Sequence, residues 1–122
     1  MEDQKFINDY LNRYKISLFE TDVEEEAIKM KELLLNVKDN GKKVIVAGNG
    51  GSAAMASHVA VDFTKQGGIR TVNFNETDLI TCFANDYGYE YWVQKAVEFY
   101  GDKDDLLILI SSSGTSRNMI NA

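Results

Sequence analysis

Two loops of this chain collect the residue types that bind oxyanions. The first follows the apolar run 44–48 and reads Gly48-Asn49-Gly50-Gly51-Ser52. The second follows the apolar run 106–110 and reads Ser111-Ser112-Ser113-Gly114-Thr115-Ser116. Glycines let a ligand approach the backbone, and N–H groups at a helix start attract anions. Either loop alone is more often a turn with a helix cap, but two at successive strand ends favour a phosphate site.

The sequences of these two loops indicate which class of phosphate compound they would bind. Neither loop has the lysine of a triphosphate-binding loop, and the glycine spacing differs from the dinucleotide-binding fingerprint. A nucleotide cofactor is therefore not expected. The loops favour a phosphomonoester carried by a small molecule.

His58 and Asp62 are the second candidate for chemistry. His58 is the only histidine of the chain, and Asp62 follows it by four residues. On the helix predicted from Ser52 to about Thr64, this spacing places both on one face. The pair could be two ligands of a zinc site, Asp62 could be a general base, or both could be ordinary surface residues. Asp86 is a further carboxylate, in the expected turn Asn85-Asp86-Tyr87-Gly88.

Alternating strands and helices must position these residues. Strands are predicted at 44–48, 70–74 and 106–111, and helices at 52–64, 77–84, 91–100 and from 116 onward. This alternation predicts an α/β fold with a parallel sheet. The last helix is expected to begin a buried face with Met119 and Ile120. The chain is therefore expected to be the front portion of a larger domain.

Two amphipathic helices are predicted before the sheet. The first covers residues 3–19. The second begins at a capping box, Thr21-x-x-Glu24, and ends at Asn40-Gly41. Their narrow apolar seams suit either a hairpin packed on the domain or a helical layer shared between subunits. Seam spacing alone leaves both alternatives open.

Composition excludes several classes of function. The 122 residues suit one domain, and the formal net charge of −6 argues against a nucleic-acid partner. Cys82 is the single cysteine, which suits a reducing compartment such as the cytoplasm. No apolar run approaches the ~18 residues of a membrane span. A soluble domain without membrane or nucleic-acid partners is expected.

Three segments resemble the sugar isomerase (SIS) domain and, within it, the phosphoheptose isomerases. They are VIVAGNGGSAAMASHVAVDFT (44–64), FANDYGYEYW (83–92) and LLILISSSGTSRNMI (106–120). The resemblance implies one SIS domain over residues 1–122, with a flavodoxin-like three-layer α/β/α sandwich and residues 1–41 as a helical oligomerisation region. It also implies a cytoplasmic homotetramer that converts sedoheptulose 7-phosphate to D-glycero-D-manno-heptose 7-phosphate for bacterial surface heptoses.

The resemblance also implies roles for individual residues. Ser111, Ser112, Ser113 and Ser116 would bind phosphate. The sugar would be contacted by Asn49, Gly50, Gly51, Ser52 and Asp86. His58 would bind zinc, one ion per subunit in members that carry it. Asp62 corresponds to the catalytic and metal-binding glutamate of the family.

The chain departs from the family pattern at several positions. Asp62 is one methylene shorter than the family's glutamate, and Gln66 stands where many members have arginine. The family's later glutamine and histidine correspond to positions beyond residue 122. The alternative reading is therefore a non-catalytic SIS module that binds a phosphosugar or a replication initiator protein.

Overall fold

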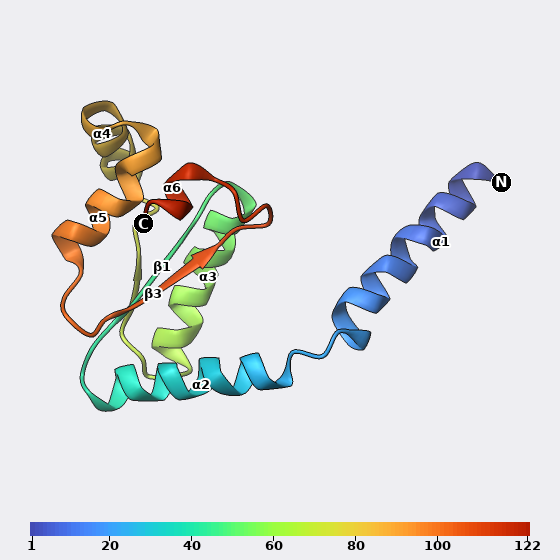
Figure 1. The fold of residues 1–122 in the computed structure, drawn as a ribbon, viewed down its shortest axis with the longest axis horizontal. Coiled ribbons are helices and arrows are strands. Elements are labelled where there is room, and N and C mark those ends of the chain that lie inside the picture. Colours follow the sequence, from blue (N-terminus) through green and yellow to red (C-terminus); the bar gives the residue numbers. More distant parts are fainter. The chain divides into compact units, whose positions relative to one another are not determined.

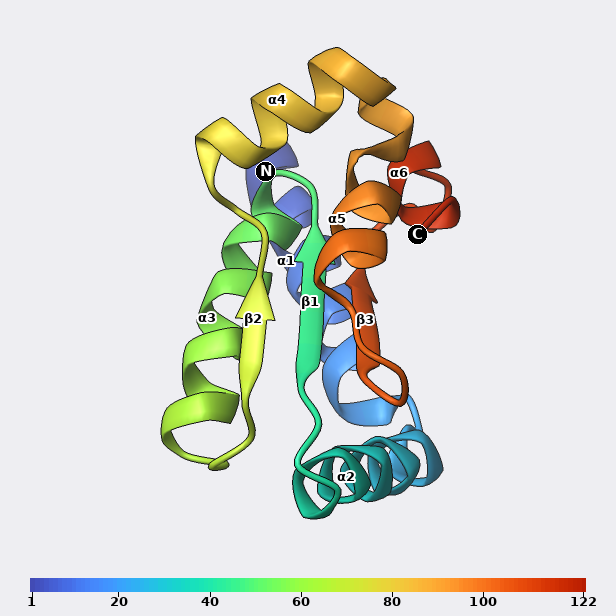
Figure 2. The same ribbon diagram turned by 90° about the vertical axis from the view of Figure 1, so that its left-hand side faces the viewer.

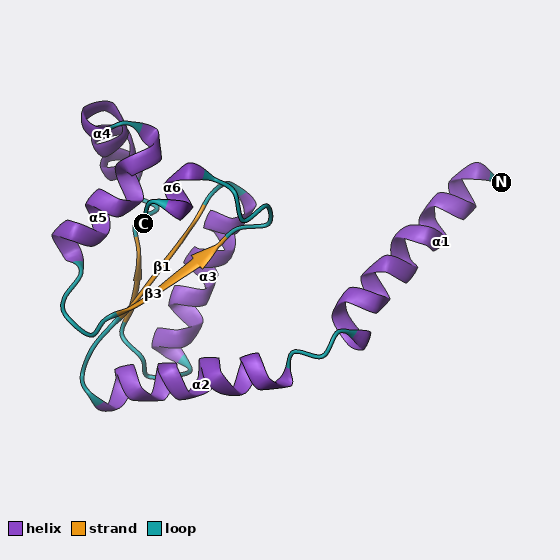
Figure 3. Cartoon of the chain, viewed as in Figure 1, coloured by secondary structure: helices purple, strands orange, loops and turns teal.

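The computed structural model describes all 122 residues, and they form two compact units, Met1–Lys31 and Glu32–Ala122. The elements are labelled in Figure 1 and coloured by type in Figure 3. The helices are α1 (Glu2–Lys15), α2 (Glu24–Asp39), α3 (Gly51–Lys65), α4 (Thr77–Tyr87), α5 (Trp92–Tyr100) and α6 (Arg117–Ile120). The strands are β1 (Val44–Gly48), β2 (Thr71–Asn73) and β3 (Leu106–Ile110). Short π and 3-10 turns cover Ile16–Glu20 and Tyr89–Tyr91.

The first unit contains α1, the π turn and the start of α2. The helix predicted over 3–19 is confirmed, although its last turn widens to a π-helix. The predicted capping box is wrong. The Thr21 hydroxyl donates back to the Ile16 carbonyl at 3.2 Å, and Asp22 instead accepts the N–H of Glu24 at 3.1 Å. No side chain of α1 is buried within the chain.

The second unit is built on a parallel sheet with the strand order β2-β1-β3. All five residues of β1 are buried, which explains why the run at 44–48 contains no polar residue. Val44 is paired with Thr71 on one side and with Leu106 on the other. The predicted parallel α/β arrangement is therefore confirmed, with β2 shorter than the range 70–74 expected from sequence.

Helices cover both faces of this sheet. On one face, Ile45 and Ala47 pack against Trp92 of α5 and Met119 of α6. The other face packs against α3 and the end of α2; the buried residues of this cluster are Val37, Val44, Val46, Ala56 and Ile69. Figure 1 shows α3 and α5 on opposite sides of the strands, and Figure 2 shows the three strands side by side. The result is the expected three-layer sandwich.

Two boundaries differ from the predictions. α4 continues through Asn85-Asp86-Tyr87, so the predicted turn is wrong, and Gly88 with φ +94° ends the helix. The short α6 buries Met119, but Ile120 is 59% exposed, so only half of the expected buried face forms. No helix in the chain combines the length and apolarity needed to cross a membrane.

Candidate active site

The turn from β1 into α3 lies at the carboxyl end of the sheet. A Cβ on Gly48 would lie 2.6 Å from the backbone carbon and oxygen of Ser52, so only glycine allows this close approach. Gly50 has φ +53°, a conformation that side chains disfavour. Beside Gly50 and Gly51 the space is open, since a Cβ on either would meet no atom within 4 Å. A ligand can therefore approach this stretch of backbone.

The N–H groups of this turn are only partly free. The carbonyl of Asn49 accepts the N–H groups of Ser52 at 2.9 Å and Ala53 at 3.3 Å. No backbone hydrogen bond uses the N–H groups of Gly50 and Gly51. The expected row of unpaired N–H groups at the start of α3 is thus reduced to two adjacent donors.

Asn49 takes part in a hydrogen-bond network that joins three elements. Its Nδ2 donates to Oδ1 of Asn118 at 2.9 Å, and Nδ2 of Asn118 donates back to Oδ1 of Asn49 at 2.7 Å. The Tyr89 hydroxyl donates to the same Asn49 oxygen at 3.1 Å. Asn118 is only 2% exposed, and these bonds satisfy both polar ends of its side chain.

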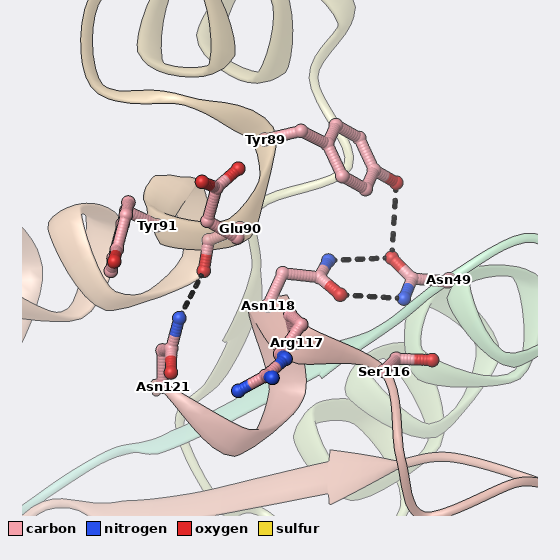
Figure 4. A pocket seen from close by; sticks show the side chains of 8 residues that line it. All are labelled: Asn49, Tyr89, Glu90, Tyr91, Ser116, Arg117, Asn118 and Asn121. Atoms are coloured by element: carbon pink, nitrogen blue, oxygen red, sulfur yellow. Dashed lines mark hydrogen bonds between the residues drawn. The ribbon is translucent and has the colours of Figure 1, made fainter.

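A cavity of about 540 Å³ surrounds this network (Figure 4). It lies where β1, the turn at Tyr89–Tyr91 and α6 meet. Its lining residues are Asn49, Tyr89, Glu90, Tyr91, Ser116, Arg117, Asn118 and Asn121. Asn121 donates to the Glu90 carbonyl at 2.9 Å, which ties the C-terminal side of α6 to the opposite wall. The cavity therefore joins Asn49 of the glycine loop to Ser116 of the serine loop.

The serine loop is folded by its own hydroxyls. Ser111 Oγ accepts the N–H of Gly114 at 3.1 Å, and Ser113 Oγ accepts the N–H of Thr115 at 3.2 Å. Both hydroxyl hydrogens are still available as donors. Ser112 is exposed, as is Ser113. Because α6 is a single turn, hydroxyls rather than a helix dipole are this loop's means of binding an anion.

His58 and Asp62 lie outside the cavity lining, on the exposed surface of α3. His58 Nε2 and Asp62 Oδ2 are 3.4 Å apart, and their side chains are 79% and 54% exposed. The spacing inferred from sequence is confirmed, but no third histidine, cysteine or acidic residue joins them to form a metal-binding cluster. These two residues alone do not fit a complete zinc site, which takes four ligands.

Asp86 is held within α4. Its carboxylate accepts the side-chain amide of Asn85 at 2.9 Å and lies 3.8 Å from the Cys82 sulfur. It is exposed and does not line the cavity. Within this chain, the cavity unites only Asn49 and Ser116 of the residues expected at the site.

An ion pair with shifted pKa values lies at the amino ends of the strands, opposite to the cavity. The Asp105 carboxylate is 6% exposed and contacts Lys43 Nζ at 2.5 Å. Burial acts to raise the pKa of Asp105, but hydrogen bonds from Lys43 and from backbone N–H groups outweigh it and lower that pKa. Hydrogen bonds to Asp102 and Asp105 raise the pKa of Lys43. This pair secures the amino ends of β1 and β3.

Sequence reasoning missed six of the eight residues that line the cavity: Tyr89, Glu90, Tyr91, Arg117, Asn118 and Asn121. Tyr89 and Asn118 lie 40 and 69 residues from Asn49 in sequence, so no local pattern connects them. Arg117 follows Ser116 directly, and its charge beside the serine loop was the one available signal.

Comparison with known proteins agrees with this architecture. The SIS domain family model matches residues 9–122. A phosphoheptose isomerase from Fusobacterium nucleatum is 40% identical over 108 residues, which cover 84% of this chain and 56% of that protein. One from Glaesserella parasuis is 34% identical over 127 aligned positions, covering 99% of this chain and 62% of that protein. The chain thus spans little more than half the length of these relatives.

Solved structures give the same assignment. A phosphoheptose isomerase from Neisseria gonorrhoeae superimposes with a TM-score of 0.87 at 31% identity. One from Francisella tularensis superimposes with a TM-score of 0.91 at 27% identity. Each comparison covers 100% of this chain and 67% of the other. The chain belongs to the SIS domain family, and its similarity within that family is to the phosphoheptose isomerases.

Proposed function

We propose that this chain provides the phosphosugar-binding part of a phosphoheptose isomerase, acting on sedoheptulose 7-phosphate and D-glycero-D-manno-heptose 7-phosphate. The observation that carries the proposal is the cavity at the carboxyl ends of the strands, where Asn49 and Ser116 meet. In parallel α/β sheets this edge is where ligands bind. Two relatives that are 40% and 34% identical to this chain are phosphoheptose isomerases.

The chemistry of the two loops supports a phosphate at one end of the ligand. Ser111 and Ser113 keep hydroxyl hydrogens free to donate, and Ser112 and Ser116 add two more hydroxyls. The N–H groups of Gly50 and Gly51 are free beside open space. Such neutral donors can bind the oxygens of a phosphate group. Arg117 adds a positive charge at the cavity wall.

Isomerisation between an aldose and a ketose moves a proton between C1 and C2 through an enediol. The reaction needs a base above the carbon and a donor near the developing oxyanion. Asp62 is our candidate for the base. Its carboxylate is 3.4 Å from His58 and 54% exposed, so a ligand can reach it. Remote binding of the phosphate would hold the sugar in place for this step.

A second function, phosphosugar binding without turnover, is favoured by one observation. The candidate base and His58 lie outside the cavity that unites the two loops. Asp62 is also shorter than the glutamate expected there. A sensor of this kind would bind the phosphosugar and leave it unchanged.

The broader setting follows from the same proposal. We propose a cytoplasmic homotetramer that supplies heptose for bacterial surface polysaccharides. Zinc would require ligands beyond His58 and Asp62, since these two do not form a complete site.

The experiment measures binding and turnover separately. Calorimetry with sedoheptulose 7-phosphate tests binding, with unphosphorylated sedoheptulose as the control ligand. NMR in D₂O tests turnover through deuterium incorporation next to the carbonyl. We expect binding that depends on the phosphate, and deuterium incorporation that D62N abolishes while binding persists.

The control variant for D62N is D39N, which neutralises another exposed carboxylate, at the end of α2. D39N should leave binding and deuterium incorporation unchanged. Binding without incorporation would favour the sensor. Equal affinity for the phosphorylated and unphosphorylated sugar would overturn the proposal.

A further inference from the structure

The hydrogen-bond network around Asn49 leaves this side chain able to donate a hydrogen bond to a ligand but not to accept one. Oδ1 of Asn49 accepts two hydrogen bonds, from Asn118 and from Tyr89, which occupies both lone pairs of an amide oxygen. Nδ2 has two hydrogens, and one of them is donated to Asn118. Asn49 therefore has one free N–H and no free acceptor.

The free N–H belongs to the edge of Asn49 that faces Ser116. In Figure 4 the Oδ1 atom of Asn49 is turned toward Tyr89, and Nδ2 is on the side of Ser116. Both residues line the same cavity. The orientation thus adds a donor to the hydroxyl side of the site.

Asn118 alone cannot set this orientation. The two amides are paired reciprocally, so a simultaneous flip of both preserves the bonds between them. Only the third bond distinguishes the two arrangements, because the flip would turn Tyr89 from a donor into an acceptor. A phenol is a better donor than acceptor, so Tyr89 favours the arrangement in which Asn49 presents its oxygen.

We infer that Tyr89 and Asn118 are positioning residues that fix Asn49 as a hydrogen-bond donor, so that the cavity receives an oxygen acceptor of the ligand beside Ser116. A phosphate or carbonyl oxygen meets this requirement. The identity of the ligand rests on the proposed function, whereas the orientation of Asn49 does not.

The first test needs no ligand. NMR cross-relaxation locates the side-chain NH₂ of Asn49 relative to the Ser116 β protons and the Tyr89 ring. We expect contacts to Ser116 in the wild-type chain. In Y89F, which removes the third bond at an exposed position, we expect contacts on both sides because both orientations become populated. Wild-type contacts to the Tyr89 ring would overturn the inference.

The second test changes Asn118 itself. In N118D, an ionised carboxyl cannot donate to Oδ1 of Asn49, and it repels that oxygen. When protonated, the same carboxyl can accept from Nδ2 and donate to Oδ1, as the amide does. Because the position is buried, the pKa of the introduced carboxyl should be raised. Because this repulsion acts in either orientation of Asn49, it should displace the side chain rather than flip it. The contacts from Asn49 to Ser116 should therefore weaken at neutral pH and recover in acid.

The matched control is N73D, the same chemical change outside the cavity, where Oδ1 accepts the Asn75 N–H at 3.0 Å and a carboxylate can still accept it. It should leave the Asn49 contacts unchanged at every pH. Circular dichroism would show whether N118D is folded. If N118D is unfolded, the Asn49 contacts in wild type and Y89F alone decide the test. Equal Asn49 contacts in Y89F and wild type would refute the role of Tyr89.

Affinity then tests the ligand. Losing one neutral hydrogen bond should weaken binding of sedoheptulose 7-phosphate to Y89F roughly two- to tenfold. N118D should bind it better in acid than at neutral pH, relative to wild type at each pH. If the wild type fails to bind the phosphosugar, the proposed function fails while the contacts still decide the orientation. If it binds and Y89F binds equally well, the inference fails alone.

Discussion

Arg117 is the one basic side chain among the residues that line the cavity, and it forms no ion pair within the chain. Glu90 is the one acidic residue of the lining. The other side chains of the lining are tyrosines, asparagines and a serine. An unpaired cation beside the serine loop is therefore available to a phosphorylated ligand.

Replacing Arg117 with alanine should weaken phosphosugar binding. Arg117 is exposed, so the loss should be about two- to fivefold at low salt and should shrink as ionic strength rises. Calorimetry at two salt concentrations measures this, with R13A on α1 as a control outside the cavity. An unchanged affinity in R117A at low salt would assign the phosphate entirely to the hydroxyls and backbone.

At the scale of elements, the turn between β1 and α3 depends on one glycine more than on its neighbours. The G48A substitution would place a Cβ 2.6 Å from Ser52 backbone atoms, so the turn must shift. We expect a loss of roughly 1–3 kcal/mol in the free energy of unfolding. G51A is the matched control because its Cβ would meet open space. Urea denaturation measures both, and equal midpoints would contradict the assignment.

The junction of β1 and β3 at their amino ends predicts a pH dependence of stability. The folded-state pKa of Asp105 is lowered, so its contribution is present above the ordinary carboxyl value of 3.8 and is lost as pH falls through the folded pKa. The raised pKa of Lys43 contributes fully below 10.5 and is lost as pH rises through its folded value. Stability should therefore fall at both extremes.

The D105N variant should flatten the acidic part of that dependence. It should also lower stability by about 1–3 kcal/mol, because a buried charged hydrogen bond is removed. D102N is the control, since the Asp102 side chain is 73% exposed and should matter little. Urea denaturation at several pH values measures both variants. An unaltered acid limb in D105N would assign acid sensitivity to other carboxyls.

The two apolar strands were the most predictable elements. The run at 44–48 indicates a strand because the central strand of a sandwich admits few polar side chains, and all five of its residues are buried. The run at 106–110 also forms a strand, although at the edge of this sheet its residues are only half-buried and Leu109 is 37% exposed. Element ends were less predictable. Asn85 and Asp86 favour turns, yet α4 includes both and ends only at Gly88. Thr21 suits a cap, yet Asp22 provides the bond.

The candidate site divides in the same way. Asn49 and Ser116 could be predicted because each follows a strand and precedes a helix. Their partners could not, since Tyr89 and Asn118 reach Asn49 only through tertiary folding. The structure leaves His58 and Asp62 on the surface of α3, away from the cavity lining. The i,i+4 spacing predicts that the two side chains lie close together on one face of the helix. It does not predict which other element or cavity that face meets.

At the scale of the whole molecule, stability and ligand binding are assigned to opposite ends of the same strands. Lys43 and Asp105 precede β1 and β3, whereas Asn49 and Ser111 follow them. Variants at the first pair should change the free energy of unfolding while leaving phosphosugar affinity unchanged at neutral pH. Arg117 should behave in the opposite way. The D105N and R117A substitutions therefore separate the two properties in one set of measurements.

The helix α1 carries apolar side chains that the chain itself leaves exposed. Ile7, Leu11 and Tyr14 are 48%, 57% and 55% exposed, and they share the seam predicted from sequence. Burial of such a seam in a second copy would remove apolar surface from water. We therefore expect the chain to self-associate through α1, in keeping with the proposed homotetramer.

The L11E substitution places a charge within that seam and should shift the chain to a smaller assembly. N12E adds the same charge one residue later, off the seam, and should leave the assembly unchanged. Sedimentation velocity at matched concentrations measures all three proteins. A monomeric wild-type chain would contradict the expectation. Equal assembly of L11E and N12E would instead place the interface on another surface, because a buried carboxylate without a partner opposes association.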